Sequence, residues 1–385
     1  MTKAEMREEI EHLTEIAGDI KPEEVFAEHM KGASHILVYG AGNMGGIFHR
    51  CLRELLPDRR ISCFLDRNAA NKPEYLGCPV YTPDDARLST ELRCDSIVVL
   101  ALLITEDGGY ESLEDDLRAL GYTKFLNAFR QMGMALPYEE SSLGDRDIFQ
   151  RERDGILQAF DMLRDEHSQE VFLSVLKAHA TLNYDLPVLS PGMTQYLDVD
   201  VPFRHNYRTF VDCGAFTGDT LAELVKRHTV DKYFGFEPDM QSYVKLSEQA
   251  DTVRNQFGEA VLFPMGVGGK NEFLQFKAIG GGASQIDSTG ETVIQVVRLD
   301  DVLKGYDNLL IKMDIEGAEI AALEGAKGII LDTKPDLAIC VYHRISDLWR
   351  IPLMLKAWVP EYKFNLRNHF MGTYETVLYA TLEGK

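Results

Sequence analysis

Apolar and polar positions in the first third of the chain follow the pattern of buried strands that alternate with helices. Short runs rich in Val, Leu and Ile are followed by turns, and then by segments whose apolar positions recur every three or four residues. This order of strands and helices is typical of a doubly wound, parallel α/β sheet. The predicted strands cover residues 35–39, 60–66, 79–81, 96–104 and 122–127, and the predicted helices cover residues 46–56 and 113–120.

A second series of the same kind begins at residue 209. Between its third and fourth strands lies a hairpin-like insertion, and its last two strands are expected to be antiparallel to each other. The chain is therefore predicted to contain two Rossmann-like, doubly wound sheets in series. The strands of the second series are predicted at 209–212, 232–237, 261–264, 309–314, 337–342, 362–367 and 375–380, and the insertion at 272–277 and 292–299.

Two further segments lack strand patterns. The N-terminal residues predict a helix whose apolar side chains share one face, and this arm is expected to pack on the rest of the chain or to join two chains in a homodimer. Between the two series, helices are predicted at 145–165 and 168–181. The predicted division is a helical arm (1–31), a Rossmann-like domain (32–130), a helical connector (131–195) and a C-terminal α/β domain (196–385).

The charge of the chain narrows its partners. Its 385 residues include 40 Lys and Arg against 61 Asp and Glu, which gives a net charge of −21. A surface of this sign repels phosphate backbones and anionic lipid heads, so neither nucleic acid nor a membrane surface is expected as the main partner.

Targeting signals and cysteine usage point to the cytoplasm. The longest apolar run, residues 97–104, is far shorter than the ~20 residues of a membrane span. The N-terminus is charged and lacks the apolar stretch of a secretory signal. The six cysteines form no C-x-x-C pair, which argues against a zinc site or a disulfide framework. We expect a soluble, cytoplasmic protein.

Small residues stand where the first strand of the second series turns into a helix. Glycine at such a turn lets the backbone approach a ligand, and the helix N-terminus directs free N–H groups toward it. Asp212 would repel a pyrophosphate there but attract an amino group. Glu237, 23 residues after Gly214 and at the tip of the next strand, is placed to accept both hydroxyls of a ribose. The pattern favours an adenosine that carries a zwitterionic amino acid, and the alternative is an acidic glycine turn without a ligand.

Five sequence blocks in this half resemble the FkbM-type S-adenosylmethionine-dependent methyltransferases, over about residues 160–385. The blocks are F-V-D-C-G-A-F-T-G-D-T, F-G-F-E-P-D, L-D-D-V-L, I-K-M-D-I-E-G-A-E and E-T-V-L-Y-A. The resemblance implies a class I methyltransferase fold, S-adenosylmethionine as cofactor and methyl transfer, typically to a hydroxyl oxygen.

The same resemblance implies a cofactor site. Glu237 would hold the ribose, and Pro238 and Asp239 would shape the adenine side. Phe216 stands where many members of the broader class have glycine, which should narrow the turn. The residues implied beside the methionine part are Asp212, Gly214, Ala215, Phe216 and Gly218, and the predicted site also includes Asp219 and Thr220 at the start of the helix.

Methyl transfer to an alcohol needs a group that removes the hydroxyl proton, since an alcohol is a poor nucleophile at neutral pH. Asp314, Glu316 and His343 are the candidates, because all three follow strands that end at the carboxyl edge of the sheet. His343 as general base competes with a purely structural histidine. Asp314 and Glu316 could instead hold magnesium, and a further alternative is that Glu316 and Glu319 merely stabilise the first turn of the following helix. The predicted site contains no metal.

A second glycine turn, G-A-G-N-M-G, spans residues 40–45 and fits G-x-G-x-x-G between a strand and a helix. Asp66 ends the next strand, as an acid that contacts ribose does. The region resembles the Rossmann-like domain that precedes catalytic modules in sugar O-acyltransferases and polysaccharide-biosynthesis epimerases. A site for a nucleotide or nucleotide-sugar, formed by Gly40, Gly42, Gly45 and Asp66, and a degenerate structural domain are both open.

The predicted function is transfer of a methyl group from S-adenosylmethionine to a hydroxyl of a small molecule, sugar or glycoconjugate, with the N-terminal domain helping to position the acceptor. One alternative is a nucleotide-sugar-modifying, NAD-dependent oxidoreductase or epimerase. The absence of a Tyr-x-x-x-Lys pair argues against it. The other alternative is a scaffold that binds the cofactor without turnover.

Overall fold

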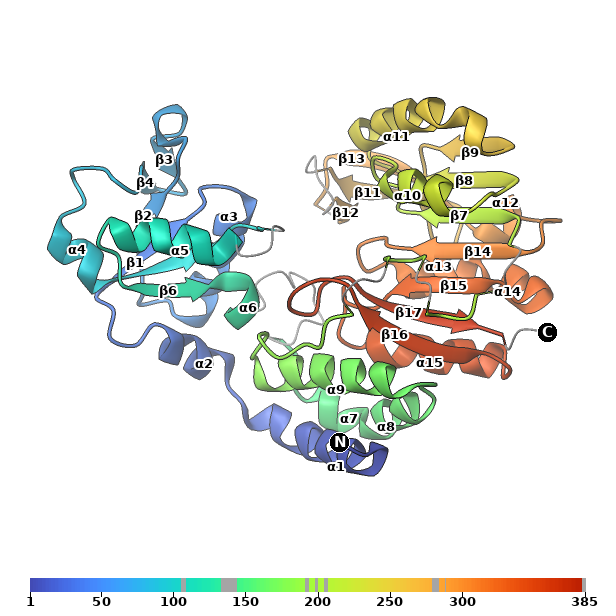
Figure 1. The fold of residues 1–385 in the computed structure, drawn as a ribbon, viewed down its shortest axis with the longest axis horizontal. Helices are drawn as coiled ribbons and strands as arrows, with labels where there is room; N and C mark the ends of the chain where they lie inside the picture. Colours follow the sequence, from blue (N-terminus) through green and yellow to red (C-terminus); the bar gives the residue numbers. More distant parts are fainter. Residues whose placement is uncertain are drawn as a thin grey trace.

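The computed structural model describes residues 1–104, 109–132, 144–190, 194–197, 200–203, 207–278, 284–287 and 289–382. Its strands form two large sheets and one small sheet (Figure 1). The large sheets correspond to the two predicted series, so the predicted pair of Rossmann-like α/β units is confirmed. Within the described ranges, none of the helices combines the length and the apolar character needed to cross a bilayer.

The N-terminal sheet has the strand order β3-β4-β2-β1-β5-β6. Its elements are α2 (Pro22–His29), β1 (His35–Tyr39), α3 (Asn43–Leu55), β2 (Ile61–Leu65), β3 (Glu74–Tyr75), β4 (Cys78–Tyr81), α4 (Thr90–Asp95), β5 (Ser96–Leu100), α5 (Gly109–Ala119), β6 (Lys124–Asn127) and α6 (Ala128–Met132). All neighbouring strands except β3 and β4 pair in parallel. Phe48 and Leu52 of α3 pack on one face, and Leu113 and Leu117 of α5 on the other.

The C-terminal sheet has the order β16-β17-β15-β14-β7-β8-β9. Its elements are β7 (Thr209–Cys213), α10 (Asp219–Arg227), β8 (Lys232–Phe236), α11 (Met240–Thr252), β9 (Glu259–Phe263), α12 (Leu299–Val302), β14 (Leu309–Met313), α13 (Glu319–Gly325), α14 (Lys327–Thr333), β15 (Asp336–Cys340), α15 (Asp347–Trp358), β16 (Lys363–Asn368) and β17 (Thr376–Thr381). β17 is antiparallel to both β15 and β16, which confirms the predicted antiparallel pair. β7 and β14, which carry the predicted site residues, are adjacent in the centre.

The insertion before β14 is a small four-stranded sheet and more than the predicted hairpin. β11 (Glu272–Lys277) and β13 (Thr292–Val297) form the antiparallel hairpin. Two strands of two residues, β10 (Gly266–Val267) and β12 (Gln285–Ile286), extend it on either side. Such short strands carry too few alternating positions to be recognised from sequence.

The N-terminal arm packs on helices of the connector. α1 (Lys3–Ile16) contacts α7 (Ile148–Arg151), α8 (Arg153–Asp161) and α9 (Glu166–Thr181), and lies beside them under the C-terminal sheet in Figure 1. Its buried side chains share one hydrophobic core with strands β14 and β15. The packing therefore groups α1 and the connector helices with the C-terminal sheet, whereas Phe26 and Met30, later in the predicted arm, belong to the core of the N-terminal sheet. The homodimer and the predicted domain boundaries stay predictions. The arm residues in the core of the C-terminal sheet are Met6, Ile10, Leu13 and Ala17.

The predicted single helix over 145–165 is wrong, because the segment breaks into α7 and α8 at Glu152. The side chain of Glu152 accepts hydrogen bonds from Trp349 Nε1 at 2.6 Å and Arg350 Nε at 3.0 Å, both on α15. A backbone at φ −108°, ψ 18° takes Glu152 out of the helix. This tertiary contact outweighs the local preference for one continuous helix.

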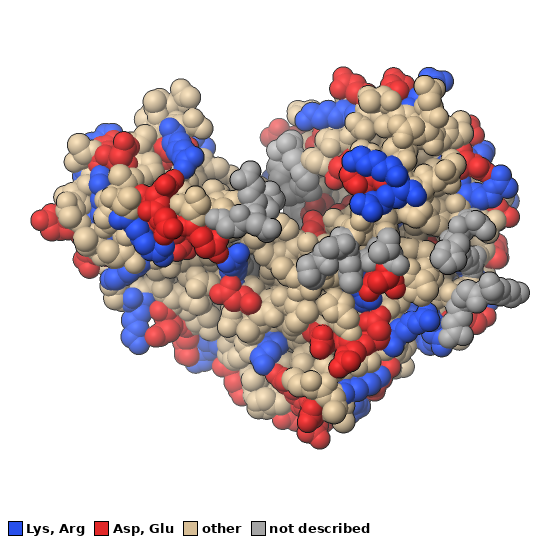
Figure 2. Space-filling view, viewed as in Figure 1, with Lys and Arg blue, Asp and Glu red and all other residues tan. Residues whose placement is uncertain are grey.

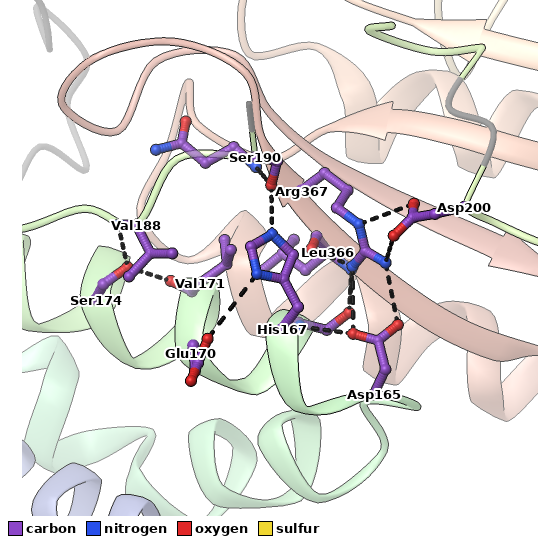
Figure 3. A network of polar contacts seen from close by, with 12 residues as sticks. Asp165, His167, Glu170, Val171, Ser174, Val188, Ser190, Asp200, Leu366 and Arg367 are labelled. Carbon is purple, nitrogen blue, oxygen red and sulfur yellow. Dashed lines mark hydrogen bonds and ion pairs between the residues drawn. The ribbon is translucent and has the colours of Figure 1, made fainter. Parts of the chain in front are cut away.

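A buried arginine joins β16 to the connector (Figure 3). Arg367 is 2% exposed and pairs with Asp165 at 3.2 Å and with Asp200 at 2.7 Å. It also donates to the hydroxyl of Ser168, whose backbone N–H is capped by Asp165 at the start of α9. Removing one partner of a buried ion pair commonly costs about 3–5 kcal/mol. This network therefore fixes α9 against the edge of the sheet.

Candidate active site

The turn between β7 and α10 contains a position that only glycine can occupy. Gly214 has a φ of +79°, and a Cβ there would lie 1.8 Å from the carbonyl oxygen of Asp314. Phe216 also has a positive φ, +45°, which is unusual for a bulky residue and occurs mostly where function requires it. Because the turn lies directly against the end of β14, the predicted cofactor and acceptor residues meet at one place.

Glu237, at the tip of β8, ties this turn to the next one. Its Oε2 accepts from the backbone N–H of Phe216 at 2.9 Å, and its Oε1 accepts from that of Asp239 at 2.8 Å. Glu237 is 7% exposed, and burial raises the pKa of its carboxyl to about 7. Each carboxylate oxygen can accept more than one hydrogen bond, so the side chain retains capacity for ligand hydroxyls.

A cavity of about 290 Å³ lies at the carboxyl edge of β7, β8 and β14. Strands and turns of the small sheet complete its wall through Phe276, Ser284 and Ile294. The hydroxyl of Ser284 donates to Asp239 Oδ2 at 2.9 Å, which joins the small sheet to the start of α11. Eight predicted site residues line this cavity, namely Gly214, Phe216, Asp219, Thr220, Glu237, Pro238, Asp314 and Glu316.

The other predicted residues of this site lie behind the cavity wall. Ala215 and Gly218 are buried in the turn, and Asp239 is buried as the N-cap of α11, where it accepts from Gln241 N–H. Asp212 and His343 are buried as well. These five residues therefore do not line the cavity themselves, and they support the neighbouring residues that do.

Asp212 is placed differently from the prediction. It is fully buried, 3.0 Å from Lys312 Nζ, and accepts from the hydroxyl of Tyr233 at 2.8 Å. Burial raises the pKa of Asp212, and the Lys312 ammonium opposes this rise. Lys312 lines the cavity and also donates to the carbonyl of Gly214 at 2.6 Å. Of this ion pair, Lys312 lines the cavity and Asp212 does not.

Asp314 and Glu316 directly follow β14 and line the cavity. Asp314 accepts from the hydroxyl of Tyr196 at 2.7 Å and from that of Tyr342 at 3.3 Å. Burial acts to raise the pKa of Asp314, but Lys312 and His343 outweigh it and lower the pKa. This carboxylate is therefore ionised and held in one orientation.

The geometry does not favour the predicted role of His343 as general base. The ring is 2% exposed, with Nδ1 2.9 Å from Glu319 Oε1 and Nε2 3.4 Å from Asp314 Oδ1 and 3.7 Å from Glu316 Oε2. Burial lowers the pKa of His343, but the three carboxylates outweigh it and raise the pKa to about 10. A protonated imidazole has no lone pair for a substrate proton, so His343 orients the acids around it.

Glu375, just before β17, is a cavity residue that was not predicted as part of the site. Its carboxylate accepts a hydrogen bond from the amide of Gln195. One of its oxygens lies within 4.8 Å of ligand atoms of both Asp314 and Cys340. Burial, and next the charge of Asp314, raise the pKa of Glu375 to about 7. Its φ of +55° is one of four positive values among the non-glycine residues that line the cavity, beside those of Tyr196, Phe216 and Glu316.

Some of the unpredicted residues had a signal in the sequence. Lys312 and Glu319 belong to the block I-K-M-D-I-E-G-A-E, and Glu375 opens the block E-T-V-L-Y-A. Gln195 and Tyr196 lie in a stretch without strand or helix patterns, where nothing in the sequence pointed to a cavity.

Two side chains of the same unit bind carbonyl groups of the N-terminal glycine turn. Lys72 Nζ donates to the carbonyl of Ala41 at 2.7 Å, and the hydroxyl of Tyr75 donates to that of Gly42 at 2.8 Å. Gly40 and Asp66 line a separate cavity of about 620 Å³ between the ends of β1 and α5. Of the four predicted residues of this second site, Gly42 and Gly45 are not among the described lining residues.

Residues 212–366 match the family model described as the Methyltransferase FkbM domain. The matched segment begins at the end of β7 and contains β8, β14 and β15, and thus the glycine turn, Glu237 and the Asp314–His343 cluster. It excludes the N-terminal sheet, and it ends before Glu375.

Among solved structures, the chain is similar to the crystal structure of the methyltransferase FkbM from Methylobacillus flagellatus KT. The TM-score is 0.69 and the identity is 24%, over 98% of this chain and 100% of that chain. At this identity the likeness concerns the fold, which extends over both large sheets. No curated protein is similar enough to match the chain.

Proposed function

We propose that the FkbM methyltransferase domain at residues 212–366 binds S-adenosylmethionine in the 290 Å³ cavity and methylates a hydroxyl group of a small acceptor, such as a sugar or glycoconjugate. The observation that carries the proposal is the position of Glu237. Its buried carboxylate lines the cavity at the end of the strand that follows the glycine turn, where an acid can accept ribose hydroxyls.

Other features of the cavity fit the same cofactor. The absence of a side chain at Gly214 lets the turn approach β14 closely, and Lys312 offers a buried ammonium to the carboxylate of an amino acid. Pro238, Phe276 and Ile294 present apolar surface that suits the plane of a nucleobase. The methionine part thus lies toward Lys312, and the adenosine part toward Glu237.

When bound, S-adenosylmethionine supplies a methyl group that is already activated by its sulfonium. The chain must align the acceptor and remove its proton. We assign the proton to Glu375, because its carboxylate lines the cavity, whereas His343 is 2% exposed and does not line it. Asp314, held by Tyr196 and Tyr342, orients the acceptor hydroxyl.

Transfer of labelled methyl groups tests this function. The full chain is incubated with methyl-labelled S-adenosylmethionine and a panel of sugars and nucleotide-sugars, beside amines of similar size. We expect label in hydroxyl-bearing acceptors, and a loss of turnover of about a hundredfold or more in Glu375→Gln. Glu361→Gln, which changes an exposed acid, is the control. Label on amines alone would contradict the hydroxyl acceptor.

For the N-terminal sheet we propose a role in positioning the acceptor. Met371, in the turn between β16 and β17, packs against the core that contains Tyr39 and Leu100. The same turn leads into Glu375, so the N-terminal sheet supports the segment that carries the proposed base. Lys72 and Tyr75 over the glycine turn favour this role over binding of a dinucleotide or nucleotide-sugar. We place the reaction in the cytoplasm, where the six free thiols stay reduced.

A further inference from the structure

We propose that Asp314, Glu316 and His343 form a binding site for one divalent cation at the wall of the cavity. The cation site stands on the geometry of these three side chains. Its role in catalysis rests on the function proposed above, because the cation would contact the acceptor hydroxyl.

The three ligand atoms converge on one point. Nε2 of His343 lies 3.4 Å from Asp314 Oδ1 and 3.7 Å from Glu316 Oε2, and all three atoms are within 4.8 Å of one another. Ligands about 2.1 Å from a common ion are about 3 to 4.2 Å apart in octahedral or tetrahedral geometry. The side chains are thus already spaced for a shared ion.

A third carboxylate, that of Glu319, orients the imidazole through its other ring nitrogen. Glu319 is fully buried, and its Oε1 lies 2.9 Å from His343 Nδ1 and accepts from the backbone N–H of Ile315 at 3.0 Å. Histidine ligands of metals commonly donate their other ring N–H to a carboxylate, which fixes both the tautomer and the direction of the ring. In the free chain His343 is an imidazolium, so a cation would displace the Nε2 proton and take its place; the proton that stays on Nδ1 then directs Nε2 to the point between Asp314 and Glu316.

The site is closed on one side and open on the other. His343 is 2% exposed, whereas the side chains of Asp314 and Glu316 are 21% and 19% exposed and line the cavity. An ion held here would have its remaining coordination positions directed into the cavity. Such open positions distinguish catalytic metal sites from structural ones.

Charge also favours a cation. Asp314, Glu316 and Glu319 surround the imidazole, and Glu375 lies next to Asp314. Lys312, the ammonium that lines this cavity, is paired with Asp212. One imidazole with two carboxylates suits Mn²⁺, Fe²⁺ or Zn²⁺ better than the all-oxygen sites of Ca²⁺. Two neighbouring hydroxyls of a sugar would complete the shell, and the cation would lower the pKa of the one that is methylated.

Titration of the full chain with Mn²⁺, followed by electron paramagnetic resonance, tests the site without reference to activity. We expect one Mn²⁺ per chain with micromolar affinity, and at least tenfold weaker binding in Asp314→Asn and His343→Gln. Glu316→Gln, a partly exposed position, gives a third variant should the buried ones unfold. Glu324→Gln removes an exposed acid from neighbouring α13 and should leave the affinity unchanged.

Two results would overturn the cation site. One is no saturable binding by the folded wild type up to about 1 mM Mn²⁺. The other is the same affinity in Glu316→Gln and Glu324→Gln, which would assign the binding to surface acids. S-adenosylhomocysteine binding in the same samples separates the proposals: its presence without Mn²⁺ binding overturns the cation site alone, and its absence beside cluster-dependent Mn²⁺ binding overturns the cofactor site alone.

Discussion

The two glycine turns of this chain share one hydrogen-bond pattern. In the C-terminal unit, Glu237 accepts from Phe216 N–H at 2.9 Å and from Asp239 N–H at 2.8 Å. In the N-terminal unit, Asp66 accepts from Ala41 N–H at 3.1 Å and from Asn68 N–H at 2.8 Å. In both, the acid at the tip of the second strand joins the first turn to the second.

The two turns differ in the side-chain groups that lie next to them. The C-terminal turn faces a cavity with an ammonium and a buried carboxylate on its wall, whereas Lys72 and Tyr75 bind the carbonyls of the N-terminal turn. A glycine turn with an acid on the next strand is thus a folding solution in both units. Both turns lie beside a cavity, of about 290 Å³ in the C-terminal unit and about 620 Å³ in the N-terminal unit, so the two differ in the groups that line the cavity and not in the space available.

The largest effect is expected when a glycine in each turn is replaced by alanine, which adds a single methyl group. Gly214→Ala would place a Cβ 1.8 Å from the Asp314 carbonyl at a φ of +79°, whereas a Cβ at Gly42 meets nothing within 4 Å. We expect Gly214→Ala to weaken S-adenosylhomocysteine binding by about a hundredfold or more, and Gly42→Ala to leave it unchanged. Calorimetric titration of both variants measures this. Equal affinities would show that the C-terminal turn is not in the site.

The second largest effect is expected from substitutions of the two acids, Glu237 and Asp66. Glu237→Gln removes the ionised acceptor for ribose hydroxyls, and we expect affinity for S-adenosylhomocysteine to fall about 10- to 100-fold, the value of a hydrogen bond to a charged group. Asp66→Asn, the matched change in the other unit, should have no effect on this affinity. The same titration compares them, and a loss in Asp66→Asn alone would move the cofactor to the N-terminal sheet.

The pH dependence of binding should come from Glu237. Its pKa is raised by burial to about 7 in the free protein, and hydroxyl donors stabilise the ionised form, so binding lowers this pKa. Affinity is therefore full above pH 7 and decreases as the pH falls, by up to about tenfold per pH unit. Binding isotherms between pH 6 and 8 measure it. A profile that keeps its shape in Glu237→Gln would assign the dependence to another group, such as Glu375.

The smallest effect is expected at Tyr75, whose hydroxyl binds the N-terminal turn. The ring of Tyr75 packs edge-on against that of Phe64, with 5.1 Å between the ring centres. Lys72 Nζ lies 3.7 Å from the centre of the Tyr75 ring. Tyr75→Ala should lower the free energy of unfolding of this unit by about 1–3 kcal/mol, with S-adenosylhomocysteine affinity unchanged. Urea unfolding followed by circular dichroism gives the first value. A changed cofactor affinity would show that the two sites communicate.

Much of the fold could be predicted from the sequence, because both sheets are buried on two faces and their strands are dense in branched apolar residues. The predicted bounds of β1 and β11 are those of the structure. The pairing of α1 with the connector could not be predicted. An apolar helical face shows that the helix is covered, but it does not show by what.

The site was predictable where function is local in sequence. Gly214 and Glu237 lie on consecutive strands, so their spacing alone indicates a shared ligand. Lys312, Tyr196 and Glu375 come from three distant segments and meet only in the folded chain. The contact between His343 and Glu319, which follows a different strand, could not be predicted from the sequence. Without that contact, His343 is interpreted as a general base.

Calorimetric titration of the wild-type chain with S-adenosylhomocysteine tests the central claim most directly, because it needs neither the acceptor nor a cation. The account predicts one binding site per chain, weakened about 10- to 100-fold by Glu237→Gln and unchanged in Asp66→Asn. Absence of binding to the folded wild type would contradict the assignment of the C-terminal cavity.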